Sequence, residues 1–176
     1  VQILIKYKQY VQQQLLPNIE IEKKVTGITQ LMHSKYKILV GLHIRRTDFK
    51  YFENARFYYN DEVYLMAIAH FINAINTPSQ EIAFVLCSDE DIDVSKYALY
   101  NIFFERRTTA EDFFLLAKCD YIIATRSIFS TMANYFCNNK IYQITEVDKV
   151  FSLDDFMRSE DLLASKYNLK EKQDVN

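Results

Sequence analysis

The sequence predicts an α/β domain with three layers and a mainly parallel sheet. Five short apolar segments alternate along the chain with segments that have helical spacing or helix-start signals. A repeated strand–helix–strand order calls for right-handed crossovers, which place a parallel sheet between two layers of helices. The length of 176 residues corresponds to about one domain, and 49% hydrophobic residues suffice for a full core.

Two helices are predicted ahead of the first strand. Residues 1–14 and about 18–33 carry apolar side chains at helical spacing, and Pro17 separates them because proline interrupts helical hydrogen bonding. The first strand is predicted at Ile38–Ile44, a continuous apolar run of the kind that parallel sheets bury on both faces. We therefore expect this strand to be covered on both sides.

Four more strands follow, each bounded by polar residues and separated from the next by a segment with helical character. They are predicted at Ile82–Cys87, Ile102–Phe104, Tyr121–Ala124 and Ile141–Ile144. The helices between and after them begin at a Ser, Thr or Asp that precedes the apolar positions. These starts are Asp61 before Val63–Ile75, Thr108 with Glu111 before Phe113–Ala117, Ser127 before the run through Phe136, and Ser152 with Asp155 before Phe156, Leu162 and Leu163.

The chain is expected to form one domain without internal repeats. The only linker-like piece is the polar stretch from about 48 to 60, the element between 91 and 100 is short, and the charged tail from Asn168 onward is expected to fray. Residues 1–35 are predicted as helices that lead into the domain, residues 36–150 as the sheet domain, and residues 151–176 as a C-terminal helix and tail.

Composition excludes several classes of protein. With 21 Lys and Arg against 23 Asp and Glu, the net charge of -2 gives no uniform positive field for nucleic acid or acidic lipid. Two glycines, Gly27 and Gly41, cannot build a glycine-rich phosphate loop.

Cys87, Cys119 and Cys137 lack CxxC spacing and are interpreted as reduced core thiols, which favours the cytoplasm. No run of about 18 apolar residues predicts a transmembrane segment.

Polar residues gather directly after three of the five predicted strands. In an open parallel sheet, ligands bind beyond the carboxyl ends of the strands, so these residues are candidates for one shared crevice. They are His43, Arg45, Arg46 and Asp48 after the first strand, Ser88, Asp89 and Glu90 after the second, and Thr125, Arg126, Ser127 and Ser130 after the fourth.

Two adjacent arginines, Arg45 and Arg46, are the most informative of these residues. A charge near an apolar core is costly unless an anion meets it, and guanidinium grips phosphate oxygens with two parallel hydrogen bonds. A permanent cation also stabilises a phosphate leaving group as its charge grows. The alternative is that Arg45 or Arg46 forms a structural ion pair with Asp48, and spacing alone favours neither.

The other candidates also have two interpretations each. Ser127 opens a helix whose free N–H groups favour an anion, and Ser130 lies one turn further on, so both could complete a diphosphate site. Taken alone, Ser127 is more simply an N-cap. Asp89 could accept hydrogen bonds from a ribose diol or the N–H edge of guanine, or it could cap the next helix.

Metal and histidine chemistry receive little support. Asp91 and Asp93 form a DxD pattern, which in some sugar-transferring enzymes holds a divalent ion, but the acidic run is more typical of a solvated helix start, so no metal is expected. His43 lies between apolar neighbours and is interpreted as a satisfied buried histidine, whereas His33 and His70 lack partners at metal-ligand spacing. The absence of GxSxG, HExxH and CxxC leaves hydrolase triads and zinc chemistry unsupported.

Three blocks of the sequence resemble the fucosyltransferase superfamily. Gly41–Asp48 (GLHIRRTD) resembles the HxRxGD/HxRRTD motif of α-1,2-, α-1,6- and protein O-fucosyltransferases. Phe84–Asp89 is similar to a second block of the superfamily. Glu111–Tyr121, leading to Ser127–Ser130, is similar to the pattern of bacterial α-1,2-fucosyltransferases, which are glycosyltransferase family 11-like. Order and spacing agree over roughly residues 36 to 145, which is most of the chain.

The resemblance implies a GT-B glycosyltransferase, of which this chain is the C-terminal, Rossmann-like donor-binding half. It implies GDP-fucose as the donor, inversion at the fucose carbon, a glycan hydroxyl as the acceptor, and no required cofactor or metal. It also implies a role for each matching residue. Arg45 would bind the β-phosphate and support GDP departure, with Arg46 beside it and Asp48 orienting both arginines. His43 would contact the nucleotide, and Asp89 and Ser88 would bind the guanine or the ribose. Ser127 and Ser130 would contact the diphosphate.

Two departures from the family pattern leave questions open. Thr47 stands where the α-1,2 group has glycine and the α-1,6 group has threonine, so the linkage is unresolved. Only 42 residues precede the motif, where the family has an acceptor-binding domain, so a missing N-terminal domain is expected. The general base is open among Asp48, Glu53, Asp112 and the missing half.

Two other hypotheses stand beside a fucosyltransferase donor domain. One is a non-catalytic nucleotide-sugar-binding or scaffold domain of a glycan assembly protein, and the other is an α/β enzyme with a different phosphorylated ligand. The richness in Tyr, Phe, Lys and Ile is typical of an AT-rich bacterial genome. The expected location is the cytoplasm, with a peripheral place at the inner membrane as the alternative.

Overall fold

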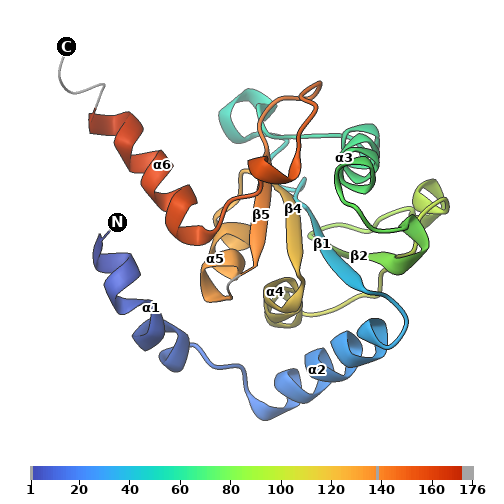
Figure 1. Ribbon diagram of the computed structural model, residues 1–176. Coiled ribbons are helices and arrows are strands. Elements are labelled where there is room, and N and C mark those ends of the chain that lie inside the picture. Colours follow the sequence, from blue (N-terminus) through green and yellow to red (C-terminus); the bar gives the residue numbers. More distant parts are fainter. Residues whose placement is uncertain (1, 138, 172–176) are drawn as a thin grey trace.

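The computed structural model describes residues 2–137 and 139–171. Its centre is one sheet of five parallel strands in the order β3-β2-β1-β4-β5 (Figure 1). The strands are β1 (Ile38–Ile44), β2 (Ile82–Ser88), β3 (Ile102–Phe103), β4 (Tyr121–Thr125) and β5 (Lys140–Ile144). Each lies within one residue of its predicted bounds, so the predicted parallel α/β sheet is confirmed.

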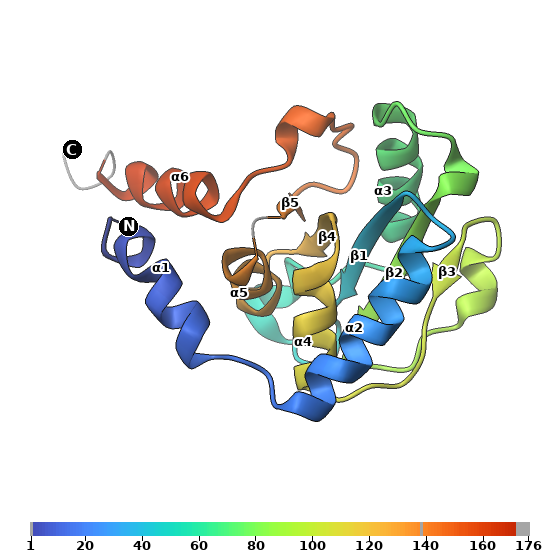
Figure 2. The same ribbon diagram turned by 60° about the horizontal axis from the view of Figure 1, so that its bottom comes forward.

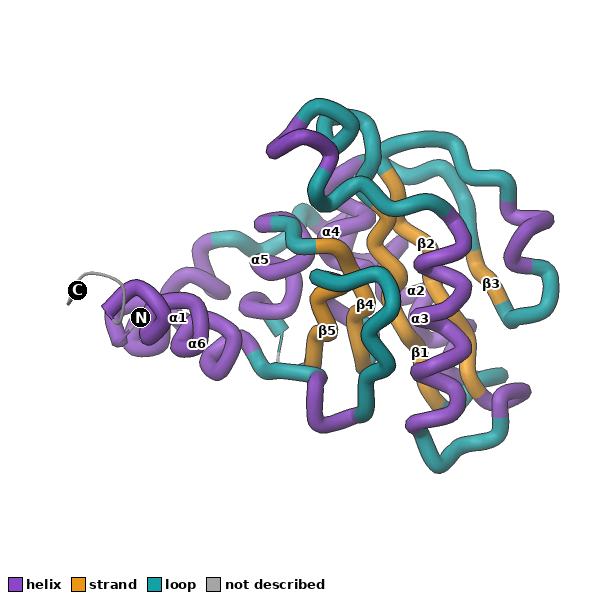
Figure 3. Tube along the Cα trace, turned by 90° about the horizontal axis from the view of Figure 1, so that it is seen from above, coloured by secondary structure: helices purple, strands orange, loops and turns teal. Residues whose placement is uncertain are grey.

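Helices cover both faces of the sheet, which gives the three predicted layers. The helices are α1 (Gln2–Gln14), α2 (Ile19–His33), α3 (Asp61–Ala74), α4 (Thr109–Lys118), α5 (Ile128–Phe136) and α6 (Ser159–Glu171). Figure 2 shows α2, α4 and α5 on one face, and Figure 3 shows α3 on the other. Side chains of β1 alternate between two buried cores, because Leu42 and Ile44 join the α3 core whereas Leu39 joins the core under α2 and α4.

The central strand also carries a glycine that lets α4 approach closely. A Cβ atom added at Gly41 would lie 2.6 Å from Cδ2 of Leu116 and 3.4 Å from Sγ of Cys119. No side chain fits there unless α4 or Leu116 moves. The glycine therefore lets the carboxyl-terminal end of α4 pack closely on β1.

The two predicted N-terminal helices are confirmed. Pro17 lies between them, and the side chain of Asn18 caps α2 by accepting a hydrogen bond from the N–H of Ile21 at 2.9 Å. Helix α1 lies beside α6, away from the sheet (Figure 1). Nζ of Lys8 and Oε1 of Glu160 join these two helices at 2.6 Å.

The C-terminal prediction needs correction. Ser152 does cap a turn with Asp155, but that turn is a short 3₁₀ segment, and α6 begins only at Ser159. The break occurs because Phe156 is buried against the aromatic core and Met157 pairs with Ile141 as an antiparallel bridge, which keeps the backbone extended. Helix α6 then continues to Glu171, and residues 172–176 lie outside the described residues, so the fraying expected from Asn168 stays a prediction.

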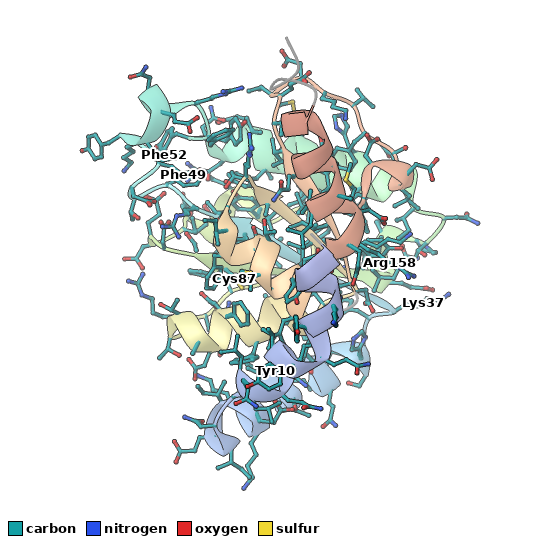
Figure 4. All side chains as sticks on the ribbon, turned by 90° about the vertical axis from the view of Figure 1, so that its left-hand side faces the viewer. Tyr10, Lys37, Phe49, Phe52, Cys87 and Arg158 are labelled. Carbon is teal, nitrogen blue, oxygen red and sulfur yellow. The ribbon has the colours of Figure 1, made fainter. Side chains whose placement is uncertain are left out.

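The stretch from 48 to 60 is packed rather than linker-like. Phe49 and Phe57 are buried, and the rings of Phe49 and Phe52 stack with centroids 5.8 Å apart. Figure 4 shows Phe49 and Phe52 together on this loop. The loop that leaves the central strand is thus held against the body of the domain.

Candidate nucleotide site

A cavity of about 240 Å³ opens beyond the carboxyl ends of β1 and β2. Its lining includes five residues that the sequence analysis selected, together with residues that follow β3 and residues from the starts of α4 and α5. The lining residues are His43, Arg45, Ser88, Asp89, Arg106, Arg107, Thr109, Asp112 and Phe129. We refer to this cavity as the strand-exit pocket.

Arg45 lines the strand-exit pocket and is also paired with Asp48. Its Nε donates to Oδ1 of Asp48 at 2.9 Å, and its Nη2 donates to Oδ2 at 2.7 Å. The two side chains are 33% and 55% exposed, and the hydrogen bond from Arg45 lowers the pKa of Asp48. Exposed ion pairs contribute about 0–1 kcal/mol, so an anion in the pocket can replace Asp48 at small cost.

Arg46 has a different environment. Its side chain is 8% exposed, and its Nη2 and Nη1 donate to Asp61 at 2.6 Å and to Glu90 at 3.1 Å. Its Nε donates to the backbone oxygen of Tyr59 at 2.8 Å. Arg46 does not belong to the lining of the pocket. The structural ion pair considered for this arginine therefore exists, with Asp61 and Glu90 in place of Asp48.

Asp89 lines the pocket and also holds the loop that follows β1. Its Oδ1 accepts from the N–H of Arg46 at 2.9 Å, and its Oδ2 accepts from the N–H and hydroxyl of Thr47 at 3.2 and 2.5 Å. Ser88 accepts from the N–H of Glu90 at 3.1 Å. The carboxylate fixes the backbone from which Arg45 projects, and it does not cap the next helical turn.

Asp91 and Asp93, the DxD pattern, are engaged separately. Asp91 pairs with Arg106, and Asp93 caps the 3₁₀ turn that follows it by accepting from the N–H of Ser95 at 3.1 Å. Within residues 2–137 and 139–171, no three His, Cys, Asp or Glu side chains are grouped so that they could hold a metal ion.

The two serines after β4 are buried near the pocket but do not line it. Ser127 is the N-cap of α5 and accepts from the N–H of Phe129 at 3.2 Å, while Ser130 donates to the backbone oxygen of Ser127 at 3.3 Å. The plain N-cap interpretation of Ser127 thus matches its contacts. What α5 does contribute to the pocket is the ring of Phe129.

His43 is buried but not satisfied, which corrects the sequence interpretation. Its Nδ1 has no hydrogen-bond partner in the described part of the chain, and its ring lies 5.0 Å from that of Phe129. Burial, assisted by the positive charge of Arg45 and opposed by Asp89, lowers its pKa to about 4. The imidazole is neutral at pH 7. A buried polar atom without a partner is costly, and a ligand or a water molecule that reaches it can satisfy it.

The sequence analysis missed the contribution of the third strand exit. Arg107, after β3, donates from Nε to Oδ1 of Asp112 at 2.7 Å, and Asp112 lies in the first turn of α4. The capping box of Thr108 and Glu111, which is confirmed, sets the start of that turn. Burial raises the pKa of Asp112 while Arg107 opposes the shift. The available signal was a second Arg-Arg pair, which follows a predicted strand after the single residue Glu105.

Three carboxylates were candidates for the general base. Asp112 lines the pocket in contact with Arg107, Asp48 pairs with Arg45 at its edge, and Glu53 lies outside the lining, half-exposed near Arg56.

The cysteines are free, with Cys87 and Cys119 buried and Cys137 half-buried. None of the helices that the structure describes has the length and apolar character that a membrane span requires.

The structure is a parallel three-layer α/β domain with an arginine-lined pocket at its strand exits, which is where open parallel sheets bind their ligands. Within this class of fold the family is specific. Residues 4–169 match the family described as Glycosyl transferase family 11, so the chain belongs to this family. The comparison with curated proteins gave no match.

The fold is similar to that of the fucosyltransferase NodZ. An α-1,6-fucosyltransferase NodZ soaked with GDP-fucose has a TM-score of 0.52 and 20% identity, covering 79% of this chain and 46% of NodZ. NodZ co-crystallised with GDP has a TM-score of 0.52 and 19% identity, with coverages of 71% and 43%. The selenomethionine form from Bradyrhizobium has a TM-score of 0.52 and 20% identity, with coverages of 78% and 45%. The chain thus spans less than half the length of each of these structures.

Proposed function

We propose that this chain is the donor-binding half of an inverting, GDP-fucose-dependent fucosyltransferase that transfers fucose to a glycan hydroxyl. Membership of glycosyl transferase family 11 supports this proposal, as does the likeness in fold to NodZ, which is described with GDP and with GDP-fucose. The observation that carries it is the position of Arg45, which lines the strand-exit pocket and pairs with the exposed carboxylate of Asp48.

In this proposal Arg45 binds the β-phosphate of the donor. A diphosphate brings more negative charge than Asp48 and can accept both hydrogen bonds that Asp48 now accepts. Asp48 orients the guanidinium before the donor binds and is then displaced by the diphosphate. Arg46 is buried beside Asp61 and Glu90 and stabilises the loop that carries Arg45. Ser127 and Ser130 stabilise the start of α5. We therefore assign these three residues a structural role and no direct contact with the donor.

The nucleoside then lies over the rest of the pocket. The neutral imidazole of His43 and the ring of Phe129 offer an aromatic wall with one free hydrogen-bonding atom. Two carboxylates, Asp89 and Asp112, could accept from the N–H edge of guanine. Asp89 already accepts three hydrogen bonds, so we assign the base edge to Asp112 and keep Asp89 and Ser88 for the ribose side.

The reaction is a single displacement at the anomeric carbon. An acceptor hydroxyl forms the new C–O bond, a general base takes the hydroxyl proton, and the bond between carbon and GDP oxygen breaks with inversion. Arg45 stabilises the negative charge that grows on the departing diphosphate, so the step needs no metal ion. The acceptor and its positioning groups belong to an N-terminal domain of the whole protein.

Calorimetric titration of the chain with GDP, UDP and ADP tests the proposal. We expect saturable binding of GDP, with UDP and ADP at least tenfold weaker, a difference of about 1.4 kcal/mol. No GDP binding, or equal binding of the three nucleotides, would overturn it. Fucose transfer from GDP-fucose by the longer protein, measured with a glycan acceptor, separates an enzyme from a non-catalytic nucleotide-sugar-binding module. The cytoplasmic and bacterial assignments remain predictions.

A further inference from the structure

One guanidinium in the wall of the strand-exit pocket has hydrogens without an acceptor. The side chain of Arg107 is 1% exposed, and its Nε donates to Asp112 at 2.7 Å. Its Nη2 donates to the backbone oxygen of Leu86 and lies 3.7 Å from Sγ of Cys87. Its Nη1 is buried and has no partner in the described part of the chain. Both Nη1 hydrogens therefore lack an acceptor among the described residues.

The position of this group is fixed by its surroundings. The guanidinium lies over the ring of Phe103, with the central carbon 5.6 Å from the ring centroid, and it bridges the end of β2 to the first turn of α4. A donor that is already ordered loses little entropy when a ligand accepts from it. A buried donor without an acceptor lowers the stability of the fold by about 1–3 kcal/mol. Its presence in a pocket wall therefore favours a ligand that supplies the acceptor.

The charge at this site favours a neutral acceptor over a phosphate. Asp112 neutralises Arg107 and lies in the same pocket wall, so a second anion would meet a carboxylate as well as the guanidinium. Arg45, at the β1 exit, lacks such a buried counter-ion and suits the diphosphate. The Arg107–Asp112 pair instead presents a hydrogen-bond donor beside an acceptor.

Guanine has the complementary order of groups on one edge, with the O6 acceptor next to the N1–H and N2–H donors. We propose that Nη1 of Arg107 donates to O6 of the guanine base while Asp112 accepts from the neighbouring N–H groups. Arg107 is then the residue that selects guanine over adenine, because adenine places an amino donor where guanine has O6. This inference rests on the proposed function and assigns one contact within that site.

The test compares GDP with 6-thioguanosine 5′-diphosphate, in which sulfur, a weak acceptor, replaces O6 and the N–H groups remain. Both are titrated into the chain and into the Arg107→Lys variant, which keeps the positive charge toward Asp112 but lacks the guanidinium fork. We expect the chain to bind GDP about tenfold more tightly than the thio analogue, as the loss of one charge-assisted hydrogen bond predicts. In Arg107→Lys the ratio falls to about one.

Arg56→Lys is the control, because Arg56 is exposed, pairs with Glu53 and does not line the strand-exit pocket, so the substitution should leave the GDP to thio-GDP ratio as it is. Equal affinities of the unaltered chain for the two ligands would overturn the inference, and this comparison does not depend on any variant folding. A ratio that stays near ten in Arg107→Lys would assign O6 to another group and overturn it too. Absence of GDP binding altogether would overturn the proposed function itself.

Discussion

The two arginines that follow β1 are neighbours in sequence, but one is partly exposed and the other is buried. Arg45 is a third exposed at the edge of a pocket, whereas Arg46 is buried between Asp61 and Glu90. Successive residues of an extended chain point in opposite directions, so an Arg-Arg pair after a buried strand sends one guanidinium outward and one inward. The outward arginine is available to a ligand, and the inward one stabilises the loop that carries it.

We expect alanine substitutions to separate these two roles. Arg45→Ala should abolish GDP binding in calorimetry and change the free energy of unfolding by less than about 1 kcal/mol, because it removes only an exposed ion pair. Arg46→Ala should lower the free energy of unfolding, measured in urea, by about 3 kcal/mol, because Asp61 and Glu90 lose a buried counter-ion. A large loss of stability in Arg45→Ala with GDP binding intact would contradict this division.

His43 should make stability depend on pH. In the unfolded chain it titrates near the ordinary pKa of 6.5, whereas in the folded protein its pKa is about 4. Between those values the unfolded chain binds the proton more readily, so stability is fully present above pH 6.5 and is lost as the pH falls toward 4. At pH 5 the loss due to His43 is about 2 kcal/mol.

Urea unfolding at pH 7 and pH 5 measures this loss, with His43→Phe as the variant that keeps a ring and cannot titrate. The fall in free energy of unfolding between the two pH values should be smaller in His43→Phe by about 2 kcal/mol. The same pH dependence in both proteins would show that His43 is not the group responsible.

At the scale of elements, the packing of α4 on β1 brings the end of β1 and the start of α4 into one site. Gly41 allows Leu116 and Cys119 to approach the strand, and the amino end of α4 then carries Thr109 and Asp112 to the strand exits. The capping box of Thr108 and Glu111 holds that end in place. A small residue inside a strand thus contributes to the position of a carboxylate in the pocket.

Two Gly→Ala substitutions test this packing. Gly41→Ala places a methyl group 2.6 Å from Leu116, so we expect a loss of about 1–3 kcal/mol in the free energy of unfolding. Gly27→Ala is the control: it lies inside α2 with nothing within 4 Å of the added Cβ, and there alanine should stabilise the helix by about 0.5–1 kcal/mol. Equal effects of the two changes would rule out the close approach as the reason for Gly41.

Sequence patterns predicted the strong elements and missed the weak ones for physical reasons. The apolar run of β1 and the capping box of α4 encode their structure locally, so both were predicted. Helix α6 starts later than predicted because the burial of Phe156 in the aromatic core, a tertiary effect, overrides a good cap at Ser152. Strand β3 has only two residues, so the arginines at its exit gave a weak signal and Arg107 was missed.

At the scale of the whole molecule, the chain is one layered domain whose polar chemistry lies at one end of its sheet. Arg45, His43 and Asp89 were predicted to meet there from the rule that parallel strands present their carboxyl ends at a common edge. Which side chains enter the pocket depends on side-chain direction and on ion pairs between distant segments, such as Arg46 with Asp61, and spacing alone does not encode these.

The most direct measurement of the central claim is a crystal structure of the chain grown with GDP. We expect the diphosphate to lie in the strand-exit pocket with its β-phosphate oxygens within hydrogen-bonding distance of the Arg45 guanidinium, in place of Asp48. We also expect the base to contact the wall formed by His43, Arg107 and Asp112. GDP bound elsewhere, or Arg45 still paired with Asp48 beside an occupied pocket, would contradict the assignment of Arg45 as the phosphate-binding residue.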